Sequence, residues 1–290
     1  MKYFKDALGT KDFVITSEIF LKPETDANSI KIQADVLRDY VDAILLTDNQ
    51  SGQLHMSSLV AGVLLLDAKI DPIIQLSCRN RNRISLLGDL LGCAALGMTN
   101  LSLIRGDRVP DEFQPRPKAI IDITATELIR MANKMKVDDR IKSVENFLLG
   151  GVVTPHGPKP GWQAKNITEK IDAGAQFVLT HTCLDMELLR IYMKRMVETK
   201  LLRRVSVIVG MAVLSSSEDA QWVRQNRPNV IIPNDIVTRL SNAKDPEKEG
   251  IDICSEQLNA LKTIPGVSGA HIIASEKLTN IPTTIKNANI

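Results

Sequence analysis

Along most of the chain, short and continuously apolar runs alternate with longer segments of helical periodicity. A run that is apolar at consecutive positions, and bounded by polar turns, is typical of a parallel strand covered on both faces. We therefore expect strands at residues 13–19, 41–47, 72–77, 100–104, 146–153, 176–180, 205–210 and 270–274.

The segments between these runs place apolar residues at every third or fourth position, which is the spacing of amphipathic helices. The clearest predicted helices span residues 25–40, 84–97, 185–199 and 247–263. Gly97 closes the second of them and suits the left-handed position that follows a helix. Eight strands that alternate with helices predict an α/β fold, a single-domain (β/α)8 TIM barrel over residues 1–290, with a doubly wound open sheet as the alternative.

Composition narrows the class of protein. The chain has 290 residues, 44% of them hydrophobic, and its 36 Lys and Arg residues nearly balance 34 Asp and Glu residues. A net charge of +2 gives no general electrostatic reason to bind nucleic acid or an anionic membrane. The longest clearly apolar run, residues 60–66, is far shorter than the roughly 20 residues that span a bilayer.

Several signatures of other chemistry are missing from the sequence. It contains no GxGxxG or GxxxxGK[ST] phosphate loop, no GxSxG nucleophile elbow, and neither HExxH nor a cluster of His and carboxylates that suggests a metal. The four cysteines form no CxxC pair, and Lys5 and Asp6 stand where a signal peptide needs apolar residues. We expect a cytoplasmic protein without a metal site.

Polar residues stand at the carboxyl ends of the predicted strands, which is where the active site of a (β/α)8 barrel lies. Glu18 ends the first strand, Asp107 follows the fourth, and His181 follows the sixth. Either carboxylate alone could be a helix cap or a loop anchor. Two carboxylates and a histidine at one barrel mouth instead favour an enzyme with an acid, a second carboxylate and a polar ligand.

Other polar residues keep a structural explanation beside a functional one. Asp48 suits a turn after the second strand, and His55 is expected early in a helix. His271 lies inside an apolar strand and is interpreted as a core histidine. The three arginines within residues 78–83 fit either a solvated helix start or a diphosphate site.

Longer stretches of the sequence carry a family resemblance. They are ITSEIFLKP (15–23), LLTDN (45–49), PIIQLSCRNRNR (72–83), LGMTNLSLIRGD (96–107), IDAGAQFVLTHTCLD (171–185) and PGVSGAHII (265–273). Together they resemble the methylenetetrahydrofolate reductase family over nearly the whole chain. The sequences of these stretches most resemble the short bacterial branch of the family, which lacks a regulatory domain.

The family reduces 5,10-methylenetetrahydrofolate to 5-methyltetrahydrofolate in one-carbon metabolism and methionine biosynthesis. The resemblance implies that bound FAD passes hydride from NADH or NADPH to the folate with ping-pong kinetics, and the reverse oxidation stays open. It also implies a tetrahydrofolate derivative as the substrate and a homo-oligomeric protein.

The resemblance also implies a role for each matched residue. Glu18 matches the general acid that protonates the leaving N10 of the folate, and burial at the barrel mouth is expected to raise its pKa. Asp107 matches the carboxylate that binds the pterin beside the flavin and favours the iminium cation. The expected flavin contacts are Thr47, Gln75, Arg105, Gly106, Asp107, Ala125, Thr154, His156, Asn166 and Lys170. The expected folate contacts are Asp107, His181, Asp219 and Lys277.

The sequence departs from the family pattern at several matched positions. On the folate side, His181 and Asp219 each stand in place of a glutamine, and Lys277 stands in place of an arginine. On the flavin side the replacements are Thr154 for a tyrosine, Gln75 for a histidine, Gln163 for an aspartate and Glu169 for an arginine. Three alternatives therefore stay open. They are a flavin-independent reductase with direct hydride transfer, a folate-dependent methyltransferase or methyl-transfer partner of a corrinoid protein, and a catalytically silent subunit of a redox complex.

Overall fold

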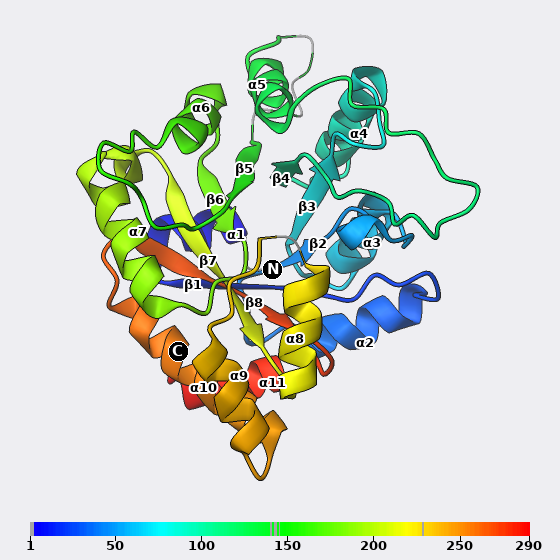
Figure 1. The fold of residues 1–290 in the computed structure, drawn as a ribbon. Coiled ribbons are helices and arrows are strands. Elements are labelled where there is room, and N and C mark those ends of the chain that lie inside the picture. Colours follow the sequence, from blue (N-terminus) through cyan, green and yellow to red (C-terminus); the bar gives the residue numbers. More distant parts are fainter. Residues whose placement is uncertain (1–2, 140, 142–143, 145, 228) are drawn as a thin grey trace.

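The computed structural model describes residues 3–139, 141, 144, 146–227 and 229–290. Within these residues, eight parallel strands pair in chain order and close into one barrel, with β1 also paired to β8 (Figure 1). The strands are β1 Val14–Glu18, β2 Ala43–Leu46, β3 Pro72–Ser77, β4 Asn100–Ile104, β5 Leu148–Val153, β6 Phe177–Thr180, β7 Ser206–Val213 and β8 Val267–Ala274. The closed barrel confirms the predicted TIM fold and excludes the open sheet.

Helices surround the barrel and connect its strands (Figure 1). They are α1 Phe4–Thr10, α2 Ala27–Leu37, α3 Ser58–Asp67, α4 Arg83–Ala95, α5 Ala125–Met135, α6 Lys165–Ala173, α7 Met186–Glu198, α8 Ser217–Asn226, α9 Asn234–Asn242, α10 Pro246–Lys262 and α11 Asn280–Asn287. The 3-10 turns η1 Gln50–Gly52 and η3 Leu201–Arg203 follow β2 and α7. No helix of the described chain is both long and apolar enough to cross a bilayer.

The predicted bounds match the structure for β3 and β4 and fall short for β7 and β8. The strands β3 and β4 begin and end at the predicted residues. In contrast, β7 extends to Val213, beyond the predicted end at Gly210, and β8 begins at Val267, before the predicted start at Ala270. Glycines weaken the strand signal at both places, but pairing with the neighbouring strand keeps the backbone extended there. Gly97 follows α4 with a φ of +76°, as its place after the helix predicted.

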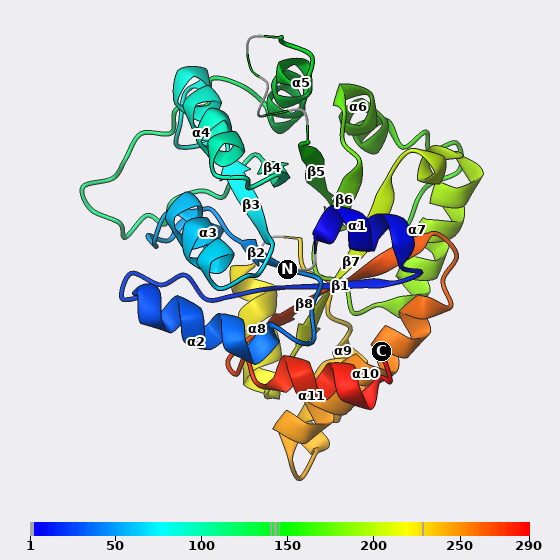
Figure 2. The ribbon, with the colours of Figure 1, turned by 180° about the vertical axis from the view of Figure 1, so that it is seen from behind.

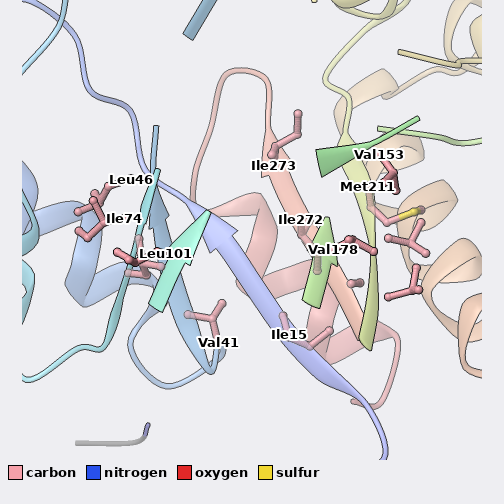
Figure 3. Packing of buried hydrophobic residues seen from close by; sticks show 14 of the residues in the cluster. Ile15, Val41, Leu46, Ile74, Leu101, Val153, Val178, Met211, Ile272 and Ile273 are labelled. Carbon is pink, nitrogen blue, oxygen red and sulfur yellow. The ribbon is translucent and has the colours of Figure 1, made fainter. Parts of the chain in front are cut away.

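Two layers of apolar side chains hold the barrel. Outside it, strand residues and the neighbouring Val41 pack against the helices. Figure 3 shows this packing for Ile15, Val41, Leu46, Ile74, Leu101, Val153, Val178, Met211, Ile272 and Ile273. Inside it, a smaller cluster fills the lumen and includes Leu45, Ile73, Leu148 and Ile208. These layers fix the strands rigidly, so residues at their ends are held in a defined arrangement.

The amino-terminal end of the barrel is filled by aromatic rings. Helix α1 lies at this end (Figure 2) and its Phe4 packs edge-on against Phe177 of β6, with ring centroids 5.5 Å apart. The backbone N–H of Phe4 donates to the carboxylate of Asp71, which precedes β3, over 2.7 Å. Phe177 also lies against Gly150 of β5, where a Cβ atom would overlap the ring. The space for a ligand is therefore left at the carboxyl ends of the strands.

Candidate functional site

A cavity of about 360 Å³ lies at the carboxyl ends of the strands. Its wall combines apolar strand residues, such as Leu45 and Ile273, with polar groups from β1, β3 and β8 and from the segments that follow β2, β4 and β6. The predicted site residues in the wall are Glu18, Thr47, Gln75, Arg105, Gly106, Asp107, Ala125, Lys170 and His181. An apolar pocket with a few convergent polar groups is typical of a small-molecule site.

Glu18 is the most enclosed carboxylate of this cavity, with 5% of its surface exposed. Its Oε1 atom accepts from Gln50 Nε2 at 3.3 Å and from Arg227 Nη1 at 3.2 Å. Its Oε2 atom lies 3.6 Å from His271 Nε2. The other ring nitrogen of His271 lies 3.0 Å from Thr16 Oγ1, so this histidine connects Glu18 to a buried hydroxyl.

These partners overturn the expected direction of the Glu18 pKa. Burial alone raises the pKa, as expected, but the charge of Arg227 and the contacts with His271 and Gln50 outweigh burial and lower it to about 2. The expectation was wrong because no sequence pattern indicates that Arg227 reaches Glu18. In this arrangement Glu18 is a carboxylate near neutral pH. Its folded-state pKa lies below its ordinary value of 4.5, so it stabilises the fold above pH 4.5, and this contribution is lost as the pH falls through about 2.

Asp107 is anchored by a turn that follows β2. Its Oδ2 atom accepts from the backbone N–H of Ser51 at 2.7 Å. Three residues of this turn have positive φ, namely Asn49 at 52°, Ser51 at 54° and Gly52 at 69°. Gly52 lies so close to the backbone of Arg108 that a Cβ atom would overlap it.

The same turn therefore positions both carboxylates. Gln50 extends from it to Glu18, while the next backbone amide binds Asp107. A residue such as Ser51 in the left-handed region costs about 1–2 kcal/mol, and such strain is found at functional sites where the surrounding structure imposes it.

His181 contributes a neutral polar group to the cavity wall. Its Nδ1 atom lies 3.0 Å from Thr154 Oγ1. Burial lowers its pKa below the ordinary 6.5, against the negative charge of Asp107, which acts in the opposite sense. At neutral pH the ring is therefore uncharged and can donate one hydrogen bond and accept another.

A second cavity, of about 290 Å³, lies beside the first, and Val152 and Lys170 line both. Besides Lys170, three predicted flavin contacts line it, namely Thr154, His156 and Asn166. The rings of His156, Trp162 and Tyr192 meet here with centroids 5.2–5.6 Å apart. Neither Trp162 nor Tyr192 was among the predicted site residues.

Lys170 stands between the two cavities. It lies on α6, and its ammonium donates to Asn166 Oδ1 one helical turn earlier. Burial lowers its pKa, against the charge of Glu169. Arg105 adds a second positive charge to the wall of the first cavity. Two cations along adjoining cavities suit an anionic ligand such as a diphosphate.

Two predicted folate contacts lie outside both cavity walls. Asp219 accepts from the backbone N–H of Ser215 at 2.8 Å and also accepts from Ser275 Oγ. Lys277 forms an exposed ion pair with Glu247 at 2.6 Å. The structure does not bring these two residues to Glu18 and Asp107, and their contact with folate stays a prediction. The replaced residues Gln163 and Glu169 are both exposed.

Three residues around Glu18 were missed in the sequence: Gln50, Arg227 and His271. His271 was interpreted as a core histidine, but it pairs in register with Thr16 and faces the cavity from β8. The alternation of side chains along a strand could have found it, because Thr16 and Glu18 share one face of β1. Arg227 lies in the segment after α8, far from Glu18 in sequence, and carries no comparable signal.

The arginines of residues 78–83 bind groups of the chain itself. Arg81 pairs with Asp89 at 2.6 Å and with Asp48, which is buried and also accepts from Ser77 N. Arg83 pairs with Asp122 at 3.0 Å, and Arg79 donates to the carbonyl of Gly106 at 3.1 Å. These contacts favour the structural explanation of the arginines over a diphosphate site.

His55 corrects a smaller expectation. It lies between η1 and α3 rather than early in a helix. Its Nε2 atom is 3.3 Å from the backbone N–H of Gln50, and its Nδ1 atom is 2.7 Å from the carbonyl of Met56. The helix begins later because residues 53–57 connect the strained turn to α3.

Comparisons with known proteins are consistent with this geometry. A family model described as methylenetetrahydrofolate reductase matches residues 3–289. One similar structure is an uncharacterized protein from Clostridium thermocellum that binds two copies of 5-methyl-5,6,7,8-tetrahydrofolic acid. Its sequence is 15% identical, and the match covers 98% of this chain and 96% of that protein with a TM-score of 0.64. Mycobacterium tuberculosis tryptophan synthase is 12% identical over 98% of this chain and 94% of its own, with a TM-score of 0.51. The two structures share the fold. No curated protein matches the sequence.

Proposed function

The chain belongs to the methylenetetrahydrofolate reductase family, and we propose that it converts 5,10-methylenetetrahydrofolate to 5-methyltetrahydrofolate, or runs the reverse oxidation, with NADH or NADPH and FAD. The observation that carries this proposal is the placement of Glu18 and Asp107 in the wall of one cavity at the strand ends. The bound ligand of the Clostridium thermocellum protein supports a folate as the substrate.

The residues of the two adjoining cavities fit a flavin dinucleotide. Lys170 and Arg105 offer positive charge for its diphosphate, and Gly106, with a φ of +86°, lies where a Cβ atom would overlap Ser77. Thr47, Gln75 and Ala125 line the first cavity, while Thr154, His156 and Asn166 line the second. When bound, FAD supplies the capacity to accept and return hydride.

Glu18 handles the proton on N10 of the folate. Opening the five-membered ring of the substrate leaves N10 with an electron pair, and a protonated Glu18 supplies the proton. In the reverse direction N10 loses its proton to the Glu18 carboxylate as the ring closes. The neighbouring Thr16–His271 pair holds the carboxyl group at the cavity wall.

Asp107 handles charge rather than protons. The open folate carries a positive charge on its iminium group, and a carboxylate in a partly enclosed cavity stabilises that charge. The bond from Ser51 N fixes its Oδ2 atom, so little reorganisation accompanies the reaction. The neutral ring of His181 can hydrogen-bond the folate where the family carries a glutamine.

A methyltransferase, or a methyl-transfer partner of a corrinoid protein, is the second candidate. It is favoured by the changed folate-side residues and by the position of Asp219 and Lys277 outside the cavity walls. Such a protein would move an intact methyl group without net redox chemistry. Methyl transfer that proceeds with neither flavin nor nicotinamide present would select it over the reductase.

Flavin binding is the first expected result. We expect the purified protein to be yellow and to oxidise NADH with menadione as the acceptor. Replacing Lys170 by Gln should weaken FAD binding about 10- to 100-fold, because a charge-assisted hydrogen bond contributes about 1.5–3 kcal/mol. Quenching of FAD fluorescence during titration measures this change.

Lys165 supplies the matched control on the same helix. Its side chain is 87% exposed and lies outside both cavity walls, so Lys165→Gln should leave FAD affinity unchanged. A wild-type protein that binds FAD negligibly but still reduces the folate with NADH would contradict the flavin role. That outcome would establish direct hydride transfer from the nicotinamide.

A further inference from the structure

Arg227 is the one cation that touches Glu18 directly among the described residues, apart from the ring of His271. Helix α8 ends at Asn226, and the backbone N–H of Arg227 still donates to the carbonyl of Val223 at 3.0 Å. This bond fixes the backbone from which the guanidinium reaches the cavity. The side chain is 15% exposed, so its charge meets Glu18 with little intervening water.

The contact between α8 and the turn after β2 brings the two donors of Glu18 together. Ser51 Oγ lies 3.5 Å from the carbonyl of Asn226, next to Arg227. Gln50 and Arg227 consequently reach the same oxygen, Oε1, from two adjoining segments. Oε2 is left to face His271.

We infer that Arg227 is a positioning residue that holds Glu18 as a carboxylate, so that the substrate-free site is set to take the proton from N10 of 5-methyltetrahydrofolate. The inference rests on the proposed function for its folate chemistry, but the contact between Arg227 and Glu18 does not. A carboxylate can accept a proton at once, whereas reduction draws on the small protonated fraction of Glu18.

Other ionisable groups face the same cavity. The negative charge of Asp107 would oppose ionisation of Glu18. Its Oδ2 atom accepts a hydrogen bond from Ser51 N, which offsets part of that charge. His271 contacts the second oxygen of Glu18, and this contact adds to the effect of Arg227. The remaining groups in the wall are Arg105, Lys170 and His181, and none of them bonds to Glu18. Arg227 is therefore the group whose removal should change the ionisation of Glu18 most.

The balance of the oxidative step is simple. A hydride leaves the methyl carbon for an oxidised flavin or nicotinamide, which is thereby reduced. N10 then forms the bond to that carbon, and the N10 proton moves to the Glu18 carboxylate. Each later turnover requires Glu18 to release this proton to solvent, and the nearby charge of Arg227 favours that release.

The direct test follows the carboxyl carbon of Glu18 by 13C NMR in the substrate-free protein between pH 4 and 8. Its signal is assigned as the one lost in Glu18→Gln. In the wild type we expect no titration in this window. In Arg227→Gln a titration should appear there, because burial raises the pKa once the charge is gone. The Arg227→Lys variant, which keeps the charge, should resemble the wild type.

Two further variants keep the inference testable. Arg239 pairs with Glu249 and Glu256 on an exposed surface, so Arg239→Gln is a matched arginine loss that should leave Glu18 untitrated. Gln50→Leu removes the uncharged donor of the same oxygen and should also leave it untitrated. A Glu18 that titrates in Gln50→Leu, or fails to titrate in a folded Arg227→Gln, overturns the inference.

Kinetics then test the chemical consequence. In the wild type, kcat/KM for methylenetetrahydrofolate reduction should fall about tenfold for each unit of rising pH, while kcat/KM for methyltetrahydrofolate oxidation stays level. In Arg227→Gln the reductive profile should gain a plateau at low pH. If Arg227→Gln lowers kcat/KM equally at every pH and leaves the pH profile unchanged, the role of Arg227 is merely structural. If the wild type turns over no folate at all, the proposed function fails, and the NMR titration still decides the role of Arg227.

Discussion

Replacing Glu18 by Gln should lower the rate of folate reduction by about 10²- to 10⁴-fold, the usual contribution of a positioned acid or base. The amide keeps the shape of the side chain and can still accept from Arg227, but it cannot exchange a proton with N10. Oxidation of NADH with menadione should change by less than about twofold, since neither reduction of the flavin by NADH nor its reoxidation by menadione needs a proton at N10. Stopped-flow measurement of each half-reaction separates the two effects.

The matched control for this substitution is Glu24, an exposed carboxylate on the loop that follows the same strand. Glu24→Gln should leave both half-reactions unchanged. If Glu18→Gln slows the two half-reactions equally, its role is to shape the cavity, and the assignment of Glu18 as the proton-handling group is wrong.

Replacing Gly150 by Ala should lower the free energy of unfolding by about 1–3 kcal/mol, the usual cost of overfilling a packed core. The added methyl group would overlap the ring of Phe177. That ring is fully buried and packs against Phe4, so it has no free space to enter. Urea denaturation followed by circular dichroism measures the change.

Gly88 provides the opposite control. It lies within α4, and a Cβ atom added there meets no atom within 4 Å. Gly88→Ala should therefore raise the free energy of unfolding by about 0.5–1 kcal/mol through helix propensity. Adding Phe177→Leu to Gly150→Ala should recover part of the lost stability. A Gly150→Ala protein as stable as the wild type would show that the ring can move aside.

The fold was predictable because its signals are local and repeated. Each strand of the barrel is a short apolar run, and eight such runs between helical segments permit few architectures. The ends of β7 and β8 were missed for the same reason, since Gly210 and Gly269 look like strand ends locally and are kept extended only by their neighbours.

The candidate site was predictable where a topological rule applies. The carboxyl ends of parallel strands meet at one face, so Glu18, Asp107 and His181 could be placed together from their positions in the chain. Arg227 could not, because it approaches Glu18 from a connecting segment whose course depends on tertiary packing. The protonation state of Glu18 depends on that contact, and so its expected pKa direction was wrong.

The turn from Asn49 to Gly52 has a consequence for how this protein can change over generations. Because Gln50 binds Glu18 while the adjacent amide binds Asp107, a mutation in the turn alters both carboxylates at once. Its left-handed residues also leave few substitutions that preserve the backbone. The turn is thus a centre of epistasis. The effect of a mutation at Glu18 or Asp107 depends on which residues occupy the turn, so the two carboxylates and the turn residues are expected to evolve together.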